Sequence, residues 1–198
     1  MAKTRLIKFQ SLQLVSPILI IGYLLLGFVP NLEAVDKIAP QWVGMTILNI
    51  ISLSVFLYYR KSIEIKVTRV LTPYLSLFYI VFILWAGLSY FYAINSTEVL
   101  VNITRQVNVL WMFLSMAILL LNIKNRRFLF SWLLTIILSI ETYYVLDQMI
   151  DLIQTTGSLS NRASLKGVAA NPNITAFSIA IKIPFLIYLI FYSKKKSN

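Results

Sequence analysis

Residues 70–97 read VLTPYLSLFYIVFILWAGLSYFYAINST and contain no charged side chain. An α-helix needs ~20 predominantly apolar residues to cross the ~30 Å hydrocarbon layer of a membrane, and this run is long enough. Comparable stretches, uncharged or interrupted by a single charge, recur on both sides of it. We therefore predict an all-α, polytopic membrane protein, a single transmembrane helical domain over residues 1–198. About six spanning helices are expected, at about 12–29, 41–59, 70–92, 97–122, 128–147 and 172–192.

The composition supports this class and excludes several kinds of site. Of the 198 residues, 59% are hydrophobic and only 13% are charged, and the mean hydropathy is +0.78. A soluble domain could not bury so much apolar surface. The chain has neither cysteine nor histidine, which excludes disulfides, thiol chemistry and the commonest metal ligands. We expect no metal site and no cofactor.

The basic residues predict the orientation. They gather at alternate ends of the expected helices, where basic residues mark the cytoplasmic side of a membrane protein. Both termini are therefore expected in the cytoplasm. The net charge of +11 is explained by this topology, so we expect no nucleic-acid partner. The clustered residues are Lys3, Arg5, Lys8, Arg60, Lys61, Lys66, Arg69, Lys124, Arg126, Arg127, Lys194, Lys195 and Lys196.

A polar stretch on the opposite, outer side precedes the last helix. Residues 161–177 read NRASLKGVAANPNITAF and carry two cations, Arg162 and Lys166. Asn171 followed by proline is a helix-start signal, because asparagine caps free backbone N–H groups and proline at the first helical position loses no donor. Such a helix points the positive end of its dipole at the loop, where an anion could bind. The sequence leaves two interpretations open, a phosphate site that includes Asn173 and an ordinary capped helix.

Three charged residues, Arg105, Glu141 and Lys182, lie well inside the expected spans rather than at their ends, where charge is costly and often marks a functional site. Arg105 follows Glu98 and Asn102 on one face of the fourth helix; it either pairs locally or snorkels outward, or it lines a polar cavity. Glu141 needs a cationic partner, for which Arg105 and Lys182 are the candidates. Lys182 serves either helix packing or function. We expect the fourth, fifth and sixth helices to share a polar interior and the first two helices to be scaffold.

These motifs resemble the O-antigen ligase and polymerase family, the integral-membrane glycosyltransferases of bacterial surface-polysaccharide assembly. The segment WAGLS at 85–89, followed by a helix with an early Arg105, is similar to the family's earlier helices. The resemblance extends from about residue 70 onward. Its main pattern, an arginine, a glycine, Asn-Pro-Asn and a small-residue helix, is carried by Arg162, Gly167, Asn171, Pro172, Asn173 and Ala176.

The resemblance implies a multi-pass protein of the bacterial inner membrane that takes a glycan from an undecaprenyl diphosphate carrier. The acceptor is a glycan or a lipid; the resemblance distinguishes neither ligase from polymerase nor one sugar from another. It further implies that Arg105 and Arg162 hold the diphosphate. By their own chemistry Lys166 and the helix start at Asn171 and Asn173 could contribute to the same site. Members use a histidine in a long periplasmic loop, which this chain lacks. The catalytic residue is thus unassigned, and we expect the sequence to be the N-terminal part of such an enzyme.

Two other classes of protein stay open from the sequence. In a transporter, Glu141 and Lys182 would form an ion or proton relay along a pathway. In an accessory or structural membrane subunit, all intramembrane charges would be paired with one another.

The predicted orientation can be tested with topology reporters. Fusions after Lys61, Arg127 and Lys196 are expected to report a cytoplasmic location, because basic residues surround each of them. Fusions near Asp36 and Ser158 are expected to report an external one. An external signal after Arg127 would overturn the orientation.

Overall fold

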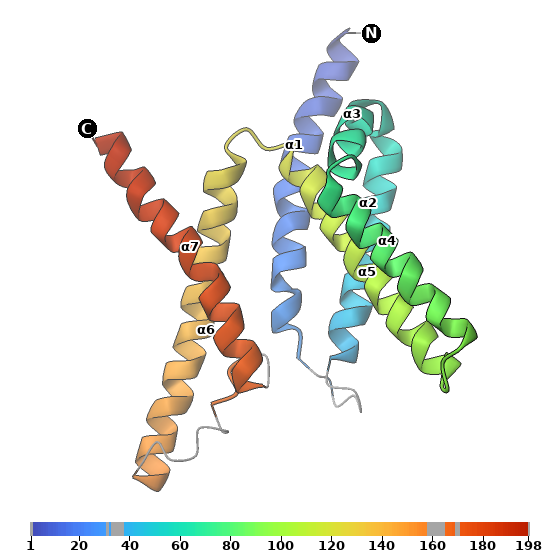
Figure 1. Ribbon diagram of the computed structural model, residues 1–198. Coiled ribbons are helices and arrows are strands. Elements are labelled where there is room, and N and C mark those ends of the chain that lie inside the picture. Colours follow the sequence, from blue (N-terminus) through green and yellow to red (C-terminus); the bar gives the residue numbers. More distant parts are fainter. Residues whose placement is uncertain (1, 31, 33–37, 158–164, 169–170, 198) are drawn as a thin grey trace. The chain divides into compact units, whose positions relative to one another are not determined.

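The computed structural model describes residues 2–30, 32, 38–157, 165–168 and 171–197. The chain divides into two compact units, residues 1–124 and residues 125–198, and each is described by itself. In the described residues all regular secondary structure is helical. The first unit contains α1 (Ala2–Leu25), α2 (Ala39–Tyr58), α3 (Arg60–Leu71), α4 (Tyr74–Leu88) and α5 (Ser96–Leu120), and the second contains α6 (Arg126–Thr156) and α7 (Pro172–Ser197) (Figure 1). Short 3₁₀ turns, η1 (Leu26–Phe28) and η2 (Ser89–Phe91), extend α1 and α4.

The six predicted spans are confirmed. Six helices are long and apolar enough to cross a membrane, and each overlaps one of the predicted segments: Ser11–Phe28, Ala39–Tyr58, Tyr74–Phe91, Ser96–Leu120, Arg126–Thr156 and Pro172–Tyr192. Large apolar side chains on these helices are widely exposed, as expected where lipid rather than protein covers them. The multi-pass, all-helical class is therefore established by the fold.

Several helix ends differ from the prediction: α1 begins earlier, at Ala2, and α7 ends later, at Ser197. The fifth predicted helix was placed at 128–147, but α6 continues to Thr156. Asp147 and Asp151 lower the hydropathy of this extension without interrupting the helix. Hydropathy indicates which residues can lie in a membrane, and a helix can continue beyond them into water. The helix ends at Gly157, whose φ of 68° is the left-handed conformation that glycine adopts readily at helix ends.

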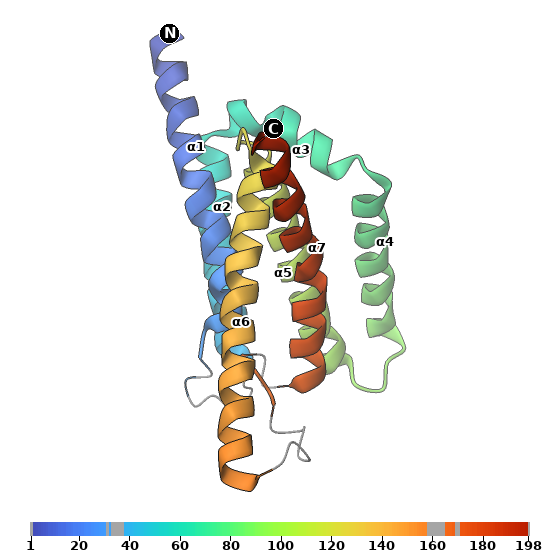
Figure 2. The same ribbon diagram turned by 90° about the vertical axis from the view of Figure 1, so that its left-hand side faces the viewer.

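The larger difference is α3, which we did not predict as a helix. Its basic residues were interpreted only as a cytoplasmic tip, yet Arg60–Leu71 forms an α-helix of 12 residues. Ile63 and Val70, spaced i and i+7, are 3% and 8% exposed and anchor it to the unit. At 1.5 Å per residue it is only ~18 Å long, too short to span a membrane. Figure 2 shows it running crosswise over the ends of α2 and α4.

A buried polar network joins α1, α2 and α5. The Tyr23 hydroxyl donates to Asn49 Oδ1 at 2.8 Å and lies 2.9 Å from Ser52 Oγ. The Asn49 amide in turn donates to the backbone oxygen of Asn108 at 3.0 Å and to its side-chain oxygen. Trp111 Nε1 donates to the Asn49 carbonyl at 3.2 Å. The first two helices were expected to be scaffold. The network shows that they also carry interior polar residues, which were not predicted because Tyr, Asn and Ser are uncharged.

The second unit is a hairpin of α6 and α7. Aromatic pairs hold one end of it: Phe130 and Phe185 meet edge to face with centroids 5.8 Å apart, and Phe128 and Tyr192 lie 5.2 Å apart. Such pairs contribute ~0.5–1.5 kcal/mol beyond the area they bury. Further along the hairpin the contacts become polar, and those residues form one of the two candidate sites.

Tyr23→Phe is expected to lower the stability of the first unit by ~1–2 kcal/mol. The change deletes one hydroxyl and leaves Asn49 Oδ1 without its donor in a buried position. Thermal unfolding in detergent micelles measures the effect. Tyr74→Phe is the matched control, since that side chain is 82% exposed. Equal melting temperatures for the two variants would show that the network does not stabilise the bundle.

Candidate functional site

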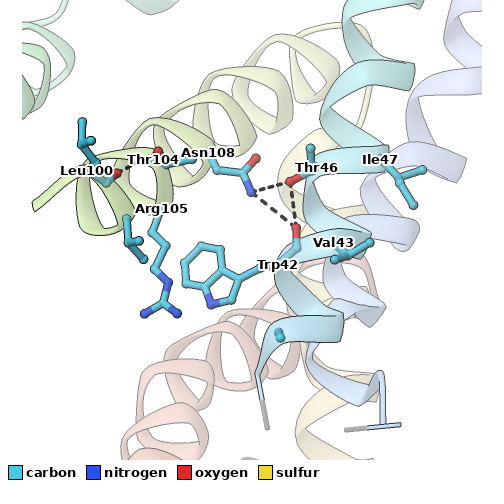
Figure 3. Close-up of a pocket in the computed structure, with 10 residues that line it drawn as sticks. Trp42, Val43, Thr46, Ile47, Leu100, Thr104, Arg105 and Asn108 are labelled. Atoms are coloured by element: carbon cyan, nitrogen blue, oxygen red, sulfur yellow. Dashed lines mark hydrogen bonds between the residues drawn. The ribbon is translucent and has the colours of Figure 1, made fainter. Parts of the chain in front are cut away.

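A groove of about 570 Å³ lies between the N-terminal halves of α2 and α5. Its lining is mostly apolar, with one charged residue, Arg105 (Figure 3). The lining residues are Ala39, Trp42, Val43, Thr46 and Ile47 from α2, and Leu100, Val101, Thr104, Arg105 and Asn108 from α5.

The spacing of the α5 residues explains how they come to share this groove. Leu100, Thr104 and Asn108 follow each other at i+4, so they occupy one face of the helix. The start of α5 is set by Asn95, whose side chain accepts a hydrogen bond from the Glu98 N–H at 3.2 Å, as its place before the helix predicts. The hydrogen bonds from Asn108 to α2 show that this face is turned toward α2.

Hydrogen bonds at the inner end of the groove hold the two helices together. Asn108 Nδ2 donates to Thr46 Oγ1 at 3.0 Å and to the Trp42 carbonyl at 3.5 Å, while Thr46 Oγ1 donates to the same carbonyl at 2.9 Å. Figure 3 shows these bonds converging on one turn of α2. The groove is therefore a built feature of the α2–α5 contact.

Arg105 lies over the indole ring of Trp42, with its Cζ atom 5.6 Å from the ring centroid. This is a cation–π contact, which stabilises a charge more strongly where water is excluded. The indole Nε1 of Trp42 is buried, and no hydrogen-bond acceptor for it is present in the described part of the chain. An arginine and a buried indole donor thus stand side by side at the groove (Figure 3).

The predicted polar face of α5 is divided between two neighbours. Arg105 faces the groove at α2, whereas Asn102 lines a smaller cavity of about 200 Å³ on the α4 side. Gln106 belongs to the same smaller cavity and accepts a hydrogen bond from the Tyr79 hydroxyl at 2.9 Å. Asn102 and Arg105 are three residues apart on the helix, and they nevertheless line different cavities.

In the second unit, Glu141 on α6 pairs with Lys182 on α7. Lys182 Nζ lies 2.7 and 2.9 Å from the two carboxylate oxygens, and the side chains are only 11% and 13% exposed. Of the two partners that the sequence allowed for Glu141, the structure shows Lys182. The prediction that Glu141 faces a cation rather than lipid is confirmed.

Ser178 completes this ion pair. Its hydroxyl donates to Glu141 at 3.1 Å, while Lys182 Nζ donates to the Ser178 carbonyl at 3.1 Å and to its hydroxyl oxygen. Every charged atom of the pair thus has partners within the hairpin. This closure favours the interpretation that Lys182 serves helix packing, because a buried charge needs both a counter-charge and hydrogen bonds.

A short segment before α7 is held against both helices. Gly167 has a φ of 56°, and its N–H donates to Gln148 Oε1 on α6 at 2.9 Å. The Thr175 hydroxyl donates to the Lys166 carbonyl at 2.6 Å. A Cβ atom on residue 167 would lie 2.5 Å from the Thr175 methyl group, so glycine is required by both conformation and space.

Asn171 caps α7 as predicted. Its Oδ1 accepts from the N–H of Asn173 at 2.9 Å and from that of Ile174 at 3.4 Å. The Thr175 N–H bonds the Asn171 carbonyl, and Pro172 has no N–H. The donors expected to face a phosphate are therefore used within the chain, which favours the capped-helix interpretation of this end.

The described residues that were predicted to bind diphosphate belong to two different units. Arg105 belongs to the first unit, and Lys166, Asn171 and Asn173 belong to the second, where the Lys166 side chain is exposed. Arg162 lies outside the described residues. Sequence reasoning missed Trp42, whose only signal is an aromatic residue one turn after the start of a span, and Asn108, a polar residue deep within one.

Comparison with known proteins adds no relative. No family model, no curated protein and no solved structure matches this chain.

Removing one partner of the Glu141–Lys182 pair is expected to cost ~3–5 kcal/mol of stability, because the remaining charge stays buried. Glu141→Gln and Lys182→Met should each lower the melting temperature and the amount of protein in the membrane. The double variant should recover most of the loss. Asp147→Asn, an exposed change on the same helix, is the control for charge removal. Additive losses in the double variant would show that the pair is not coupled.

Proposed function

We propose that this chain belongs to a membrane glycosyltransferase of the O-antigen ligase or polymerase type. It would act in the bacterial inner membrane on a glycan carried by undecaprenyl diphosphate and pass it to an acceptor glycan or lipid. The observation that carries this proposal is Arg105, held over Trp42 at a mostly apolar groove between two spanning helices.

A lipid diphosphate has an apolar chain and an anionic headgroup, and the groove offers an apolar lining and the cation of Arg105. An isoprenoid chain needs an apolar surface, which the groove offers along Val43, Ile47 and Leu100. A diphosphate needs cations, and arginine binds phosphate oxygens through two parallel N–H bonds. Stacking engages the flat face of a guanidinium, whereas phosphate binding uses its N–H edge, so the contact with Trp42 does not by itself exclude a phosphate.

Trp42 adds a second donor to the proposed site. Its indole N–H has no acceptor among the described residues, and leaving a buried donor unsatisfied costs ~1–3 kcal/mol. Because this atom is covered by protein, a phosphate oxygen beside Arg105 would supply that acceptor only after the indole ring turns toward the groove. Binding would then be favoured by the relief of this cost as well as by charge.

In the transfer reaction the cation stabilises the departing diphosphate, on which negative charge increases as the glycosidic bond breaks. Arg105 would perform this role at the groove of the first unit. The group that activates the acceptor hydroxyl is assigned to no residue of this chain.

A second candidate is an accessory or structural membrane subunit. The closed Glu141–Ser178–Lys182 cluster favours it, because a structural protein is expected to pair its intramembrane charges internally. The same closure argues against a transporter relay at these residues. The two candidates differ at Arg105, which only the enzyme needs for a ligand.

Arg105→Lys is the decisive substitution, because it keeps the charge and removes the planar two-pronged donor. Binding of radiolabelled undecaprenyl diphosphate to the purified protein should weaken about tenfold, the equivalent of ~1.4 kcal/mol. Arg105→Ala should weaken it further. Arg127→Lys, the same exchange at an exposed position, should leave binding unchanged.

The cellular arm of the test is complementation of a strain that lacks the gene, with surface polysaccharide scored and the membrane level of each variant checked. Arg105→Lys and Arg162→Lys are expected to reduce the polysaccharide at normal protein level. Wild-type binding and polysaccharide with Arg105→Ala would reject the enzyme and leave the structural subunit.

A further inference from the structure

The cationic surface of α3 is not used by the proposed function. We propose that α3 is a membrane-surface helix that binds the headgroups of anionic phospholipids, through Arg60, Lys61 and Arg69. This inference stands independently of the glycosyltransferase proposal, because it concerns another helix and another ligand.

The first argument is the placement of α3. It connects α2 to α4, both of which are long and apolar enough to span a membrane, and it runs crosswise to them (Figure 2). A helix of 12 residues between the ends of two spans lies at the level of the headgroups, because only residue 59 separates it from α2 and only residues 72 and 73 separate it from α4.

The second argument is that α3 is fixed at this level. At its start, Tyr59 forms a 2.8 Å hydrogen bond with Ser11 of α1. In its middle, Lys66 Nζ donates to the side-chain oxygen of Asn122, just beyond α5. At its end, the Ser76 hydroxyl of α4 donates to the Val70 carbonyl at 2.7 Å.

The third argument is the division of its cations. Arg60, Lys61 and Arg69 are exposed, whereas Lys66 is turned inward to Asn122, and burial lowers the pKa of its amine. Lys124, exposed after α5, adds a further cation two residues beyond Asn122. Glu64 is also exposed on α3 and reduces the positive excess by one.

The fourth argument concerns the choice of lipid over a soluble acidic partner. Ile65 lies between the exposed cations along the helix and is itself 78% exposed. Aromatic residues flank α3 on the adjoining spans, with Tyr58 64% and Tyr74 82% exposed. Aromatic side chains gather at the membrane interface, and an apolar residue among cations is typical of a helix lying in that interface.

The absence of cysteine from the sequence makes a site-specific test possible. A single Ile65→Cys change carries a fluorophore on the exposed side of α3, and Ile94→Cys, at a fully exposed position before α5, carries the same fluorophore as a control. The protein is placed in phosphatidylcholine nanodiscs. Quenching by brominated phosphatidylglycerol is then compared with quenching by brominated phosphatidylcholine at equal mole fraction.

At position 65 phosphatidylglycerol is expected to be preferred several-fold, since each cation near an anionic surface contributes up to about a fivefold effect. The preference should decline with added salt. Combined Arg60→Gln, Lys61→Gln and Arg69→Gln changes should abolish it, and Glu64→Gln should increase it. At position 94 these changes should have no effect.

Lys61→Gln and Lys66→Gln form the matched pair, because each removes one positive charge from the same helix. Only Lys61→Gln should reduce the preference measured at position 65. An equal preference for both lipids in the unchanged α3, or a preference that survives the triple change, would overturn the proposal. So would a fluorophore at position 65 that neither lipid quenches, which would point to a soluble partner on this surface.

Discussion

Hydrocarbon offers no hydrogen bonds, so every polar group within a span must find its partner in the protein. This constraint accounts for the internal design of both units. In the first, Tyr23, Asn49 and Asn108 satisfy one another across three helices. In the second, Glu141 and Lys182 neutralise each other. The apolar side chains, by contrast, need no particular partner, and many of them remain on the outside.

The same constraint explains what could be predicted from the sequence. Uncharged runs predict spans because charge is excluded from lipid, and a lone Glu141 in a span predicts a cation opposite it. The Glu141–Lys182 pair was within reach because only two intramembrane cations were available. The contact between Trp42 and Arg105 could not be predicted, because it depends on which spans are neighbours and the composition does not determine this. The helix α3 was not predicted, because its buried apolar residues are Ile63 and Val70, too few to give a helical pattern in the sequence.

Arg162 and the segment before α7 show the limit of motif reasoning. Asn-Pro-Asn predicted a helix start, and the structure has one, with Asn171 bonding the N–H groups of Asn173 and Ile174. A cap and an anion site use the same donors, so a strong cap lowers the capacity of that end for a phosphate. The glycine before it is likewise explained by φ and by Thr175. The motif is therefore sufficiently explained by structure at these positions.

Satisfied and unsatisfied polar groups then separate scaffold from candidate site. The Glu141–Ser178–Lys182 cluster is complete without a ligand, and a ligand entering there would have to break bonds already made. Trp42 is the opposite case: its buried indole donor has no acceptor among the residues that the structure describes, and it lies beside an arginine and an apolar groove. A buried donor without a hydrogen bond destabilises the protein, and a bound acceptor would remove that unfavourable free energy. Ser115 and Thr135 likewise carry buried hydroxyls without a partner among the described residues, but Trp42 differs from them in lining the α2–α5 groove.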